Sequence, residues 1–136
     1  HSCFMAGNVG ETKDTLMKSL KFAKEINADT CQFFPLMVYQ GTEAYDWAKS
    51  NGYLTTTDYK KWLTEDGLHN CVVSTPELSA EDLVNFCDYA RRSYYLSPKY
   101  LSYKILKIVR QPEELKKTLK SAKTFFRYLF KTSNKK

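Results

Sequence analysis

Two glycine-containing turns carry the residues of this chain that are best suited to binding a small ligand. The first spans residues 7–12 (GNVGET) and the second spans residues 38–42 (VYQGT). Each follows a short apolar run and precedes a helical pattern, so each is predicted to lie at the carboxyl end of a strand. Backbone N–H groups at such a turn can hold a polar or anionic ligand, and ligands of α/β proteins gather at that edge. An ordinary connecting turn is the alternative for both.

The remaining candidate groups form no catalytic or metal-binding pattern. The first turn is neither a Walker A loop nor a dinucleotide-binding fingerprint. His1 and His69 have no ligand-type neighbour at helical spacing, so we expect surface roles for them and predict no metal site. Asp58, Glu65 and Asp66 are acidic, but nothing marks them as a catalytic pair, so no catalytic residue is predicted.

The four cysteines match no zinc or iron–sulfur spacing; they are Cys3, Cys31, Cys71 and Cys87. They lie in apolar runs, and the first residues show no signal-peptide pattern. We therefore expect reduced core thiols in a cytoplasmic protein, with two disulfides as the alternative. Because the chain starts at His1 and not at a Met, it is interpreted as a processed or cut product.

Hydrophobic periodicity predicts a βαβ unit at the start of the chain. Residues 2–8 and 30–38 are predicted strands, joined by a helix over residues 11–27 with Glu11 in its first turn. Such a unit gives parallel strands with a right-handed crossover. Pro35 favours an edge strand or a bulge for the second run, because proline has no N–H to donate.

The rest of the chain is predicted to be mainly helical. Short helices are expected over residues 43–50 and 57–65, and residues 69–74 are expected to form a short strand or an extended connector. Ser79 and Asp82 have capping-box spacing before a helix that ends near residue 95. Two more helices are predicted, over residues 99–109 and from Pro112 onward, with fraying at residues 131–136.

Charge is distributed unevenly between the two parts of the chain. The net charge is +6, but residues 98–136 hold 12 Lys+Arg against 2 Glu, while residues 1–97 hold 9 against 13 Asp+Glu. This asymmetry suits a nucleic-acid or membrane-surface patch, or a solvated helical face. Tyrosines and cations interleave over residues 86–103, which suits stacking on single-stranded nucleic acid, or packing of a helix with wet hydroxyls. No apolar run reaches the ~20 residues of a membrane span.

The two turns together resemble the fifth and sixth βα units of radical S-adenosylmethionine enzymes. Residues 4–12 (FMAGNVGET) are similar to the family pattern Ile-x-Gly-Leu-Pro-Gly-Glu-Thr, and residues 33–45 (FFPLMVYQGTEAY) to the sixth strand with its Pro-Tyr-Pro-Gly-Thr turn. The tail around residues 78–79, 92–100 and 112–116 resembles the helical C-terminus of the cobalamin-binding subgroup, which includes Mg-protoporphyrin IX monomethyl ester cyclase-like iron–sulfur oxidoreductases. The chain departs from the pattern where prolines are usual, at Val9, Val38 and Gln40.

The resemblance implies an α/β fold made of the last βα units of a partial TIM-type (βα)6 barrel, followed by a helical C-terminal extension. Residues 1–54 would be the last two βα units, residues 55–77 a connector and residues 78–136 the extension. The family's Cys-x3-Cys-x2-Cys triad and its first four βα units are missing. The chain would therefore be a C-terminal fragment that is not catalytic alone.

The resemblance also implies a part of the S-adenosylmethionine pocket. The expected contacts are Met5, Gly7, Asn8, Leu36 and Met37. S-adenosylmethionine, a four-iron–four-sulfur cluster and cobalamin would belong to the longer protein, and none is expected on this fragment.

Two kinds of partner are expected for such a fragment. One is the missing N-terminal part of the longer chain. The other is a second copy, bound through the exposed sheet edge unless the tail helices fold over that edge. The alternative reading is a stand-alone basic helical module that binds nucleic acid or a protein; for the fragment itself, nucleic acid is not the expected partner.

Overall fold

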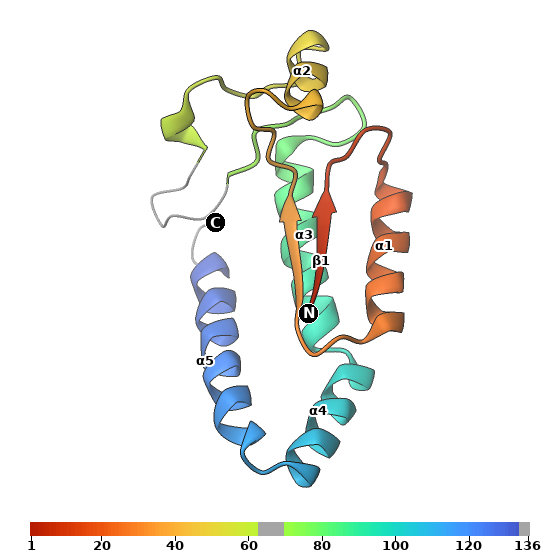
Figure 1. Cartoon of the computed structure of the whole chain (residues 1–136), viewed down its shortest axis with the longest axis vertical. Helices are drawn as coiled ribbons and strands as arrows, with labels where there is room; N and C mark the ends of the chain where they lie inside the picture. Colours follow the sequence, from red (N-terminus) through yellow and green to blue (C-terminus); the bar gives the residue numbers. More distant parts are fainter. Residues whose placement is uncertain (63–69, 134–136) are drawn as a thin grey trace. The chain divides into compact units, whose positions relative to one another are not determined.

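The computed structural model describes residues 1–62 and 70–133, with side chains described as far as residue 125. It forms two compact units, His1–Ser97 and Pro98–Lys136 (Figure 1). The first unit thus includes residues 78–97, which were predicted to belong to the C-terminal extension. The predictions that fall on residues 63–69 and 134–136, including a surface role for His69, lie outside the described residues.

The first unit is built on a two-stranded parallel sheet. Strand β1 (Ser2–Ala6) pairs with β2 (Cys31–Pro35), and helix α1 (Lys13–Ile26) forms the crossover between them. The parallel pairing of adjacent strands confirms the predicted βαβ unit. Both strands end earlier than predicted, because Gly7 turns the chain at φ +105° and the last ladder bond runs from Leu36 N–H to the Ala6 carbonyl (2.7 Å).

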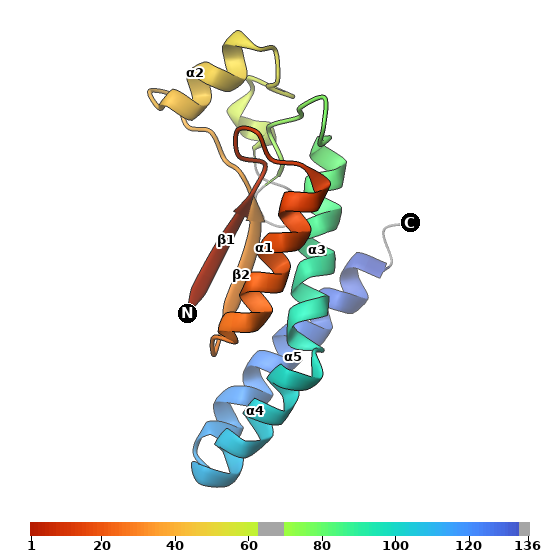
Figure 2. The ribbon, with the colours of Figure 1, turned by 90° about the vertical axis from the view of Figure 1, so that its right-hand side faces the viewer.

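Helices α1 and α3 (Ala80–Tyr95) cover one face of this sheet, and Figure 2 shows both on the same side of it. Strand alternation sends every second side chain to that face, where the rings of Phe4 and Phe33 stack at 5.4 Å between centroids. The helices contribute the apolar positions that their 3.6-residue period predicts; the buried ones are Leu16, Leu20, Ala23, Leu83, Cys87, Ala90 and Tyr94. The predicted Ser79–Asp82 capping box is present at the start of α3.

The two outer edges of the sheet differ. The Tyr95 hydroxyl accepts a hydrogen bond from Cys31 N–H (2.9 Å) and donates one to the Cys31 carbonyl (2.8 Å). Further along the same edge, Pro35 has no N–H to offer, so the outer edge of β2 is closed to another strand. The ladder bonds made by Ser2 and Ala6 leave the backbone groups of Cys3 and Met5 on the outer edge of β1, where no described strand pairs. The sheet can therefore continue on the β1 side.

Two tyrosine hydroxyls of α3, those of Tyr94 and Tyr95, differ from the expectation that they would lie in water, whereas Tyr89 is exposed. Tyr94 is fully buried and donates to the Ala28 carbonyl (2.6 Å), and Tyr95 is bonded to β2 as described above. These two rings hold α3 against the sheet and its crossover. They are therefore not available as stacking platforms for nucleic acid.

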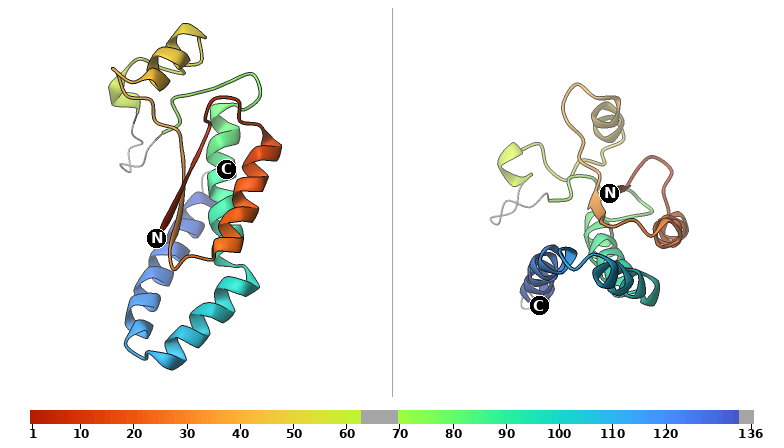
Figure 3. Two further views of the ribbon diagram at one scale, coloured as in Figure 1. Left: turned by 45° about the vertical axis from the view of Figure 1, so that its right-hand side comes forward. Right: turned by 60° about the horizontal axis from the view of Figure 1, so that its bottom comes forward.

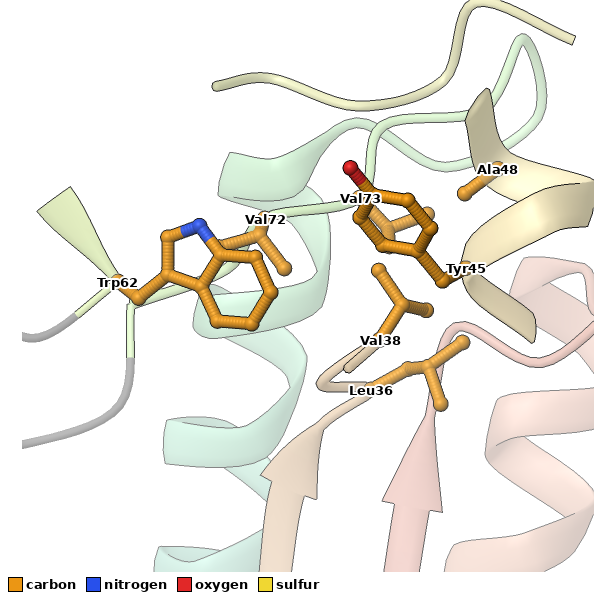
Figure 4. Close-up of a cluster of buried hydrophobic side chains, with 7 residues drawn as sticks. All are labelled: Leu36, Val38, Tyr45, Ala48, Trp62, Val72 and Val73. Carbon is orange, nitrogen blue, oxygen red and sulfur yellow. The ribbon is translucent and has the colours of Figure 1, made fainter. Parts of the chain in front are cut away.

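A second apolar cluster lies beyond the carboxyl end of β2 (Figure 4). Helix α2 (Glu43–Ser50) and the short 3-10 helix η1 (Tyr59–Lys61) flank it. Its members come from the turn after β2, from α2 and from the segment before α3, and they are Leu36, Val38, Tyr45, Ala48, Trp62, Val72 and Val73. The predicted strand near residues 69–74 is a single antiparallel bridge between Val73 and Leu54, and the predicted connector thus contributes core residues.

The second unit consists of α4 (Pro98–Arg110) and α5 (Glu114–Ser133), which are joined by a short turn and separate away from it (Figure 3). An ion pair between Lys107 and Glu114 (3.5 Å) spans the turn. Residues 131–133 are helical, although fraying was predicted there. Within the described residues, no helix has the length and apolar character needed to cross a bilayer.

The close approach of α3 to the first turn gives a test of the fold. A Cβ at Gly7 would lie 2.8 Å from Leu83 Cδ1, whereas a Cβ at Gly10, which also has positive φ, would meet nothing within 4 Å. We expect Gly7→Ala to lower the free energy of unfolding by roughly 2–4 kcal/mol, from backbone strain plus overpacking. Gly10→Ala should cost only about 1 kcal/mol, from strain alone. Urea unfolding measures both, and equal losses would contradict this account of Gly7.

The closed edge of β2 gives a second test. Tyr95→Phe should lower the free energy of unfolding by roughly 1–3 kcal/mol, because two buried backbone groups of Cys31 lose their partner. Burial raises the pKa of the Tyr95 hydroxyl above 10. Its stabilisation is therefore present below pH 10 and lost as pH rises through the folded-state pKa, so the variant should show a smaller fall in stability above pH 10. The control Tyr89→Phe changes an exposed ring and should alter neither quantity.

Candidate ligand-binding face of the sheet

Within the described part of the unit His1–Ser97, no helix covers the sheet face opposite α1 and α3. Strand alternation places four side chains on it, in register as two pairs: Cys3 beside Gln32, and Met5 beside Phe34. Met5 is 43% exposed and Phe34 is half-buried. The face is therefore apolar near the carboxyl ends of the strands and polar near their amino ends.

In the first turn, a side-chain carboxylate occupies the backbone N–H groups that an anionic ligand would otherwise bind. The Glu11 carboxylate accepts hydrogen bonds from the backbone N–H groups of Gly7 (2.5 Å) and Asn8 (3.0 Å). Glu11 was predicted in the first turn of α1, but α1 begins at Lys13 with Thr12 as its N-cap. Because these two donors are already engaged, the turn does not offer them to a ligand.

The structure distributes the five predicted contact residues over two environments. The Met5 side chain lies on the open face, and Asn8 is exposed in the turn beside it, where its Nδ2 donates to the Met5 carbonyl (3.1 Å). The Cβ position of Gly7 faces Leu83 and Leu36, so packing and positive φ explain the glycine there. Leu36 is buried in the apolar cluster beyond β2, and Met37 packs against that cluster.

Two aromatic groups at the same end of the sheet, one half-buried and one exposed, were missed by sequence reasoning. Phe34 is the register neighbour of Met5, and it could have been found by alternation from Gln32. Tyr39 lies in the second turn, exposed, with its ring 5.9 Å from that of Trp62. No sequence signal separates Tyr39 from the other tyrosines, because its exposure depends on how the segment around Trp62 packs.

A thiol–imidazole contact marks the polar end of the open face. Cys3 Sγ lies 3.2 Å from His1 Nε2, and His1 Nδ1 lies 2.5 Å from Thr30 Oγ1. Within residues 1–62 and 70–133, no three His, Cys, Asp or Glu side chains gather as a metal site. The expectation of core thiols holds for Cys31, Cys71 and Cys87 but is wrong for Cys3, because alternation along β1 turns Cys3 to the uncovered face.

Comparison with known proteins connects the chain to a methyltransferase. It is 31% identical over 98 residues to a Pyrococcus horikoshii protein named as an uncharacterized methyltransferase, a match that covers 72% of this chain and 20% of the relative. The chain therefore spans about a fifth of the length of the relative. No family model matches the chain. No solved structure matches it either.

The different surroundings of the cysteines predict selective thiol chemistry. Burial raises the pKa of the Cys31 and Cys71 thiols and raises that of Cys87 to about 12, whereas Cys3 is exposed. At pH 8 we expect iodoacetamide to alkylate Cys3 well before the other three, because the thiolate is the reactive form. Peptide mass spectrometry after timed labelling would follow each site. In guanidinium all four should react, and rapid native labelling of Cys87 would contradict the described core.

Proposed function

We propose that this chain is the C-terminal part of a radical S-adenosylmethionine enzyme that transfers a methyl group, and that the open sheet face forms part of its S-adenosylmethionine pocket. The observation that carries the proposal is the pairing of Met5 with Phe34 at the carboxyl ends of adjacent parallel strands, on the face that α1 and α3 leave uncovered. The similarity to a protein named as a methyltransferase supports the reaction class. It favours methyl transfer over cyclisation.

The chemistry of the open face suits the adenosyl part of the cofactor. A purine ring is flat and apolar on its faces, and a thioether beside a phenyl ring offers it a soft, polarisable surface. The exposed amide of Asn8 lies at the same end of the strands and can exchange hydrogen bonds with the polar edge of a purine. In this arrangement Gly7 and Glu11 shape the turn, and Leu36 and Met37 support it from the apolar cluster.

The asymmetry of the sheet edges supports the proposed partial barrel. If β1 and β2 are the last two of six parallel strands, the other four must join at the outer edge of β1. No described strand pairs with the backbone groups of Cys3 and Met5 on that edge, while Tyr95 and Pro35 close the edge of β2. The missing strands would come from the part of the longer protein to which this chain does not correspond.

The metal cofactors do not fit the residues of this chain. Of the four cysteines, three are buried separately and one lies on the open face, and no described group of three ligands could hold a cluster. In the proposal, the four-iron–four-sulfur cluster, and cobalamin where it is used, are held by the rest of the longer protein. When bound, S-adenosylmethionine would supply the methyl group or radical, and Met5, Phe34 and Asn8 would bind and orient its adenosyl part.

Calorimetric titration of S-adenosylmethionine into the longer protein tests this placement. Met5→Asp should weaken binding at least about tenfold, because it puts a carboxylate against the apolar purine site. The matched control is Met17→Asp, which changes a methionine of similar exposure (47%) on α1, away from the open face. Unchanged affinity in Met5→Asp, or equal losses in both variants, would refute the pocket.

A further inference from the structure

The α4–α5 unit exposes a row of aliphatic side chains that no described residue covers. On α4 the exposed members are Leu101, Ile105, Leu106 and Val109, and their exposed fractions run from 45% to 73%. Leu101, Ile105 and Val109 follow one another at steps of four, so they form one stripe along the helix. Leu115 and Leu119 repeat the pattern on α5, at 43% and 60%. Exposed apolar side chains that gather along one helix are a feature of interaction sites.

The α4–α5 unit is also rich in cations. Residues 98–136 hold 12 Lys+Arg and 2 Glu, and one of these carboxylates, Glu114, is paired with Lys117 (2.7 Å) and Lys107 (3.5 Å). Lys116, Lys120 and Lys123 are exposed on α5. On α4, the Lys104 ammonium lies over the rings of Tyr100 and Tyr103, at 5.5 and 5.9 Å. The unit therefore joins an aliphatic stripe to a strongly positive polar surface.

This combination selects among the partners that could cover the stripe. Nucleic acid would contact the cations and stack on the aromatic rings, but it would leave a stripe of Leu, Ile and Val exposed. The core of a protein–protein interface is apolar but depleted of lysine. An anionic lipid surface uses both parts, because an amphipathic helix buries its apolar face at the headgroup boundary while lysines contact the lipid charges.

We propose that the α4–α5 unit binds the surface of membranes that contain anionic lipids, with α4 lying in the plane of the interface. At ~1.5 Å per residue, α4 is about 20 Å long, too short to span the ~30 Å hydrocarbon core but long enough to lie along its surface. The inference rests on α4 and α5 alone and is independent of the proposed cofactor pocket.

Vesicle sedimentation with the whole chain tests the proposal. We expect binding to vesicles of phosphatidylcholine mixed with phosphatidylglycerol, much weaker binding to phosphatidylcholine alone, and loss of binding as salt screens the charges. Binding to neither vesicle would overturn the proposal. Tight, salt-dependent binding to a single-stranded oligonucleotide without vesicle binding would replace it with nucleic-acid recognition.

Matched variants separate the apolar contribution from the charge contribution. Ile105→Ser combined with Val109→Ser leaves the charge unchanged and should lower vesicle partitioning at least about tenfold. The control Val9→Ser removes a valine of similar exposure (67%) from the first unit and should bind as the unmodified chain does. Lys116→Gln combined with Lys120→Gln should lower binding to anionic vesicles by about thirtyfold, at about 1 kcal/mol for each charge.

A further variant keeps the face apolar, so that a loss of binding in the serine variant can be distinguished from a loss of helix. Circular dichroism checks the helix content of each variant. Ile105→Trp should shift its indole emission to the blue with anionic vesicles, whereas Val9→Trp should not. An Ile105→Trp signal that vesicles leave unchanged, or full binding by the double serine variant, would overturn the proposal.

Discussion

The parallel pairing of β1 with β2 determines which side chains of the first unit can meet a ligand. Alternation along paired strands divides their residues between two faces, and α1 and α3 cover only one of them. The rings of Phe4 and Phe33 pack in the core. Met5 and Phe34, one residue further along each strand, lie on the opposite face, where another partner can contact them. A shift of register by one residue would exchange these roles, so the hydrogen bond from Leu36 to Ala6 fixes the site as well as the sheet.

The glycine and the N–H groups of the first turn can be explained by ligand binding or by the packing of the fold itself. Its glycine and its outward N–H groups were expected to receive a ligand. In the structure, the glycine makes room for Leu83 of α3, and Glu11 takes the N–H groups of Gly7 and Asn8. The turn is therefore a rigid support that is complete without an anion, and ligand binding is left to the side chains beside it. A carboxylate that satisfies those donors also keeps the backbone in place when no ligand is bound.

Sequence reasoning predicted what depends on local pattern and missed what depends on distant contacts. The βαβ unit, the α3 capping box and the buried stripes of α1 and α3 follow from periodicity and cap residues. The role of Glu11, the bonds of Tyr95 to Cys31 and the exposure of Cys3 depend on which segments meet in space. For the site, Met5 was found because it is carried by a recognisable pattern. Phe34 was missed, although strand alternation places it on the same face as Gln32.

The chain exposes two apolar surfaces that differ in their electrostatic surroundings, and this difference argues for two kinds of partner. The open sheet face belongs to a segment with 13 acidic and 9 basic residues before Pro98, and its four side chains include no Asp, Glu, Lys or Arg. A face of that kind suits an aromatic cofactor and the remainder of a barrel, whose contacts are made by shape and apolar burial. The stripe on α4 belongs to a segment, residues 98–136, with an excess of ten positive charges. So many like charges would repel one another in a closed protein core. Lysines are tolerated around an apolar stripe when the opposite surface is negative and wet, as the headgroup region of an anionic membrane is.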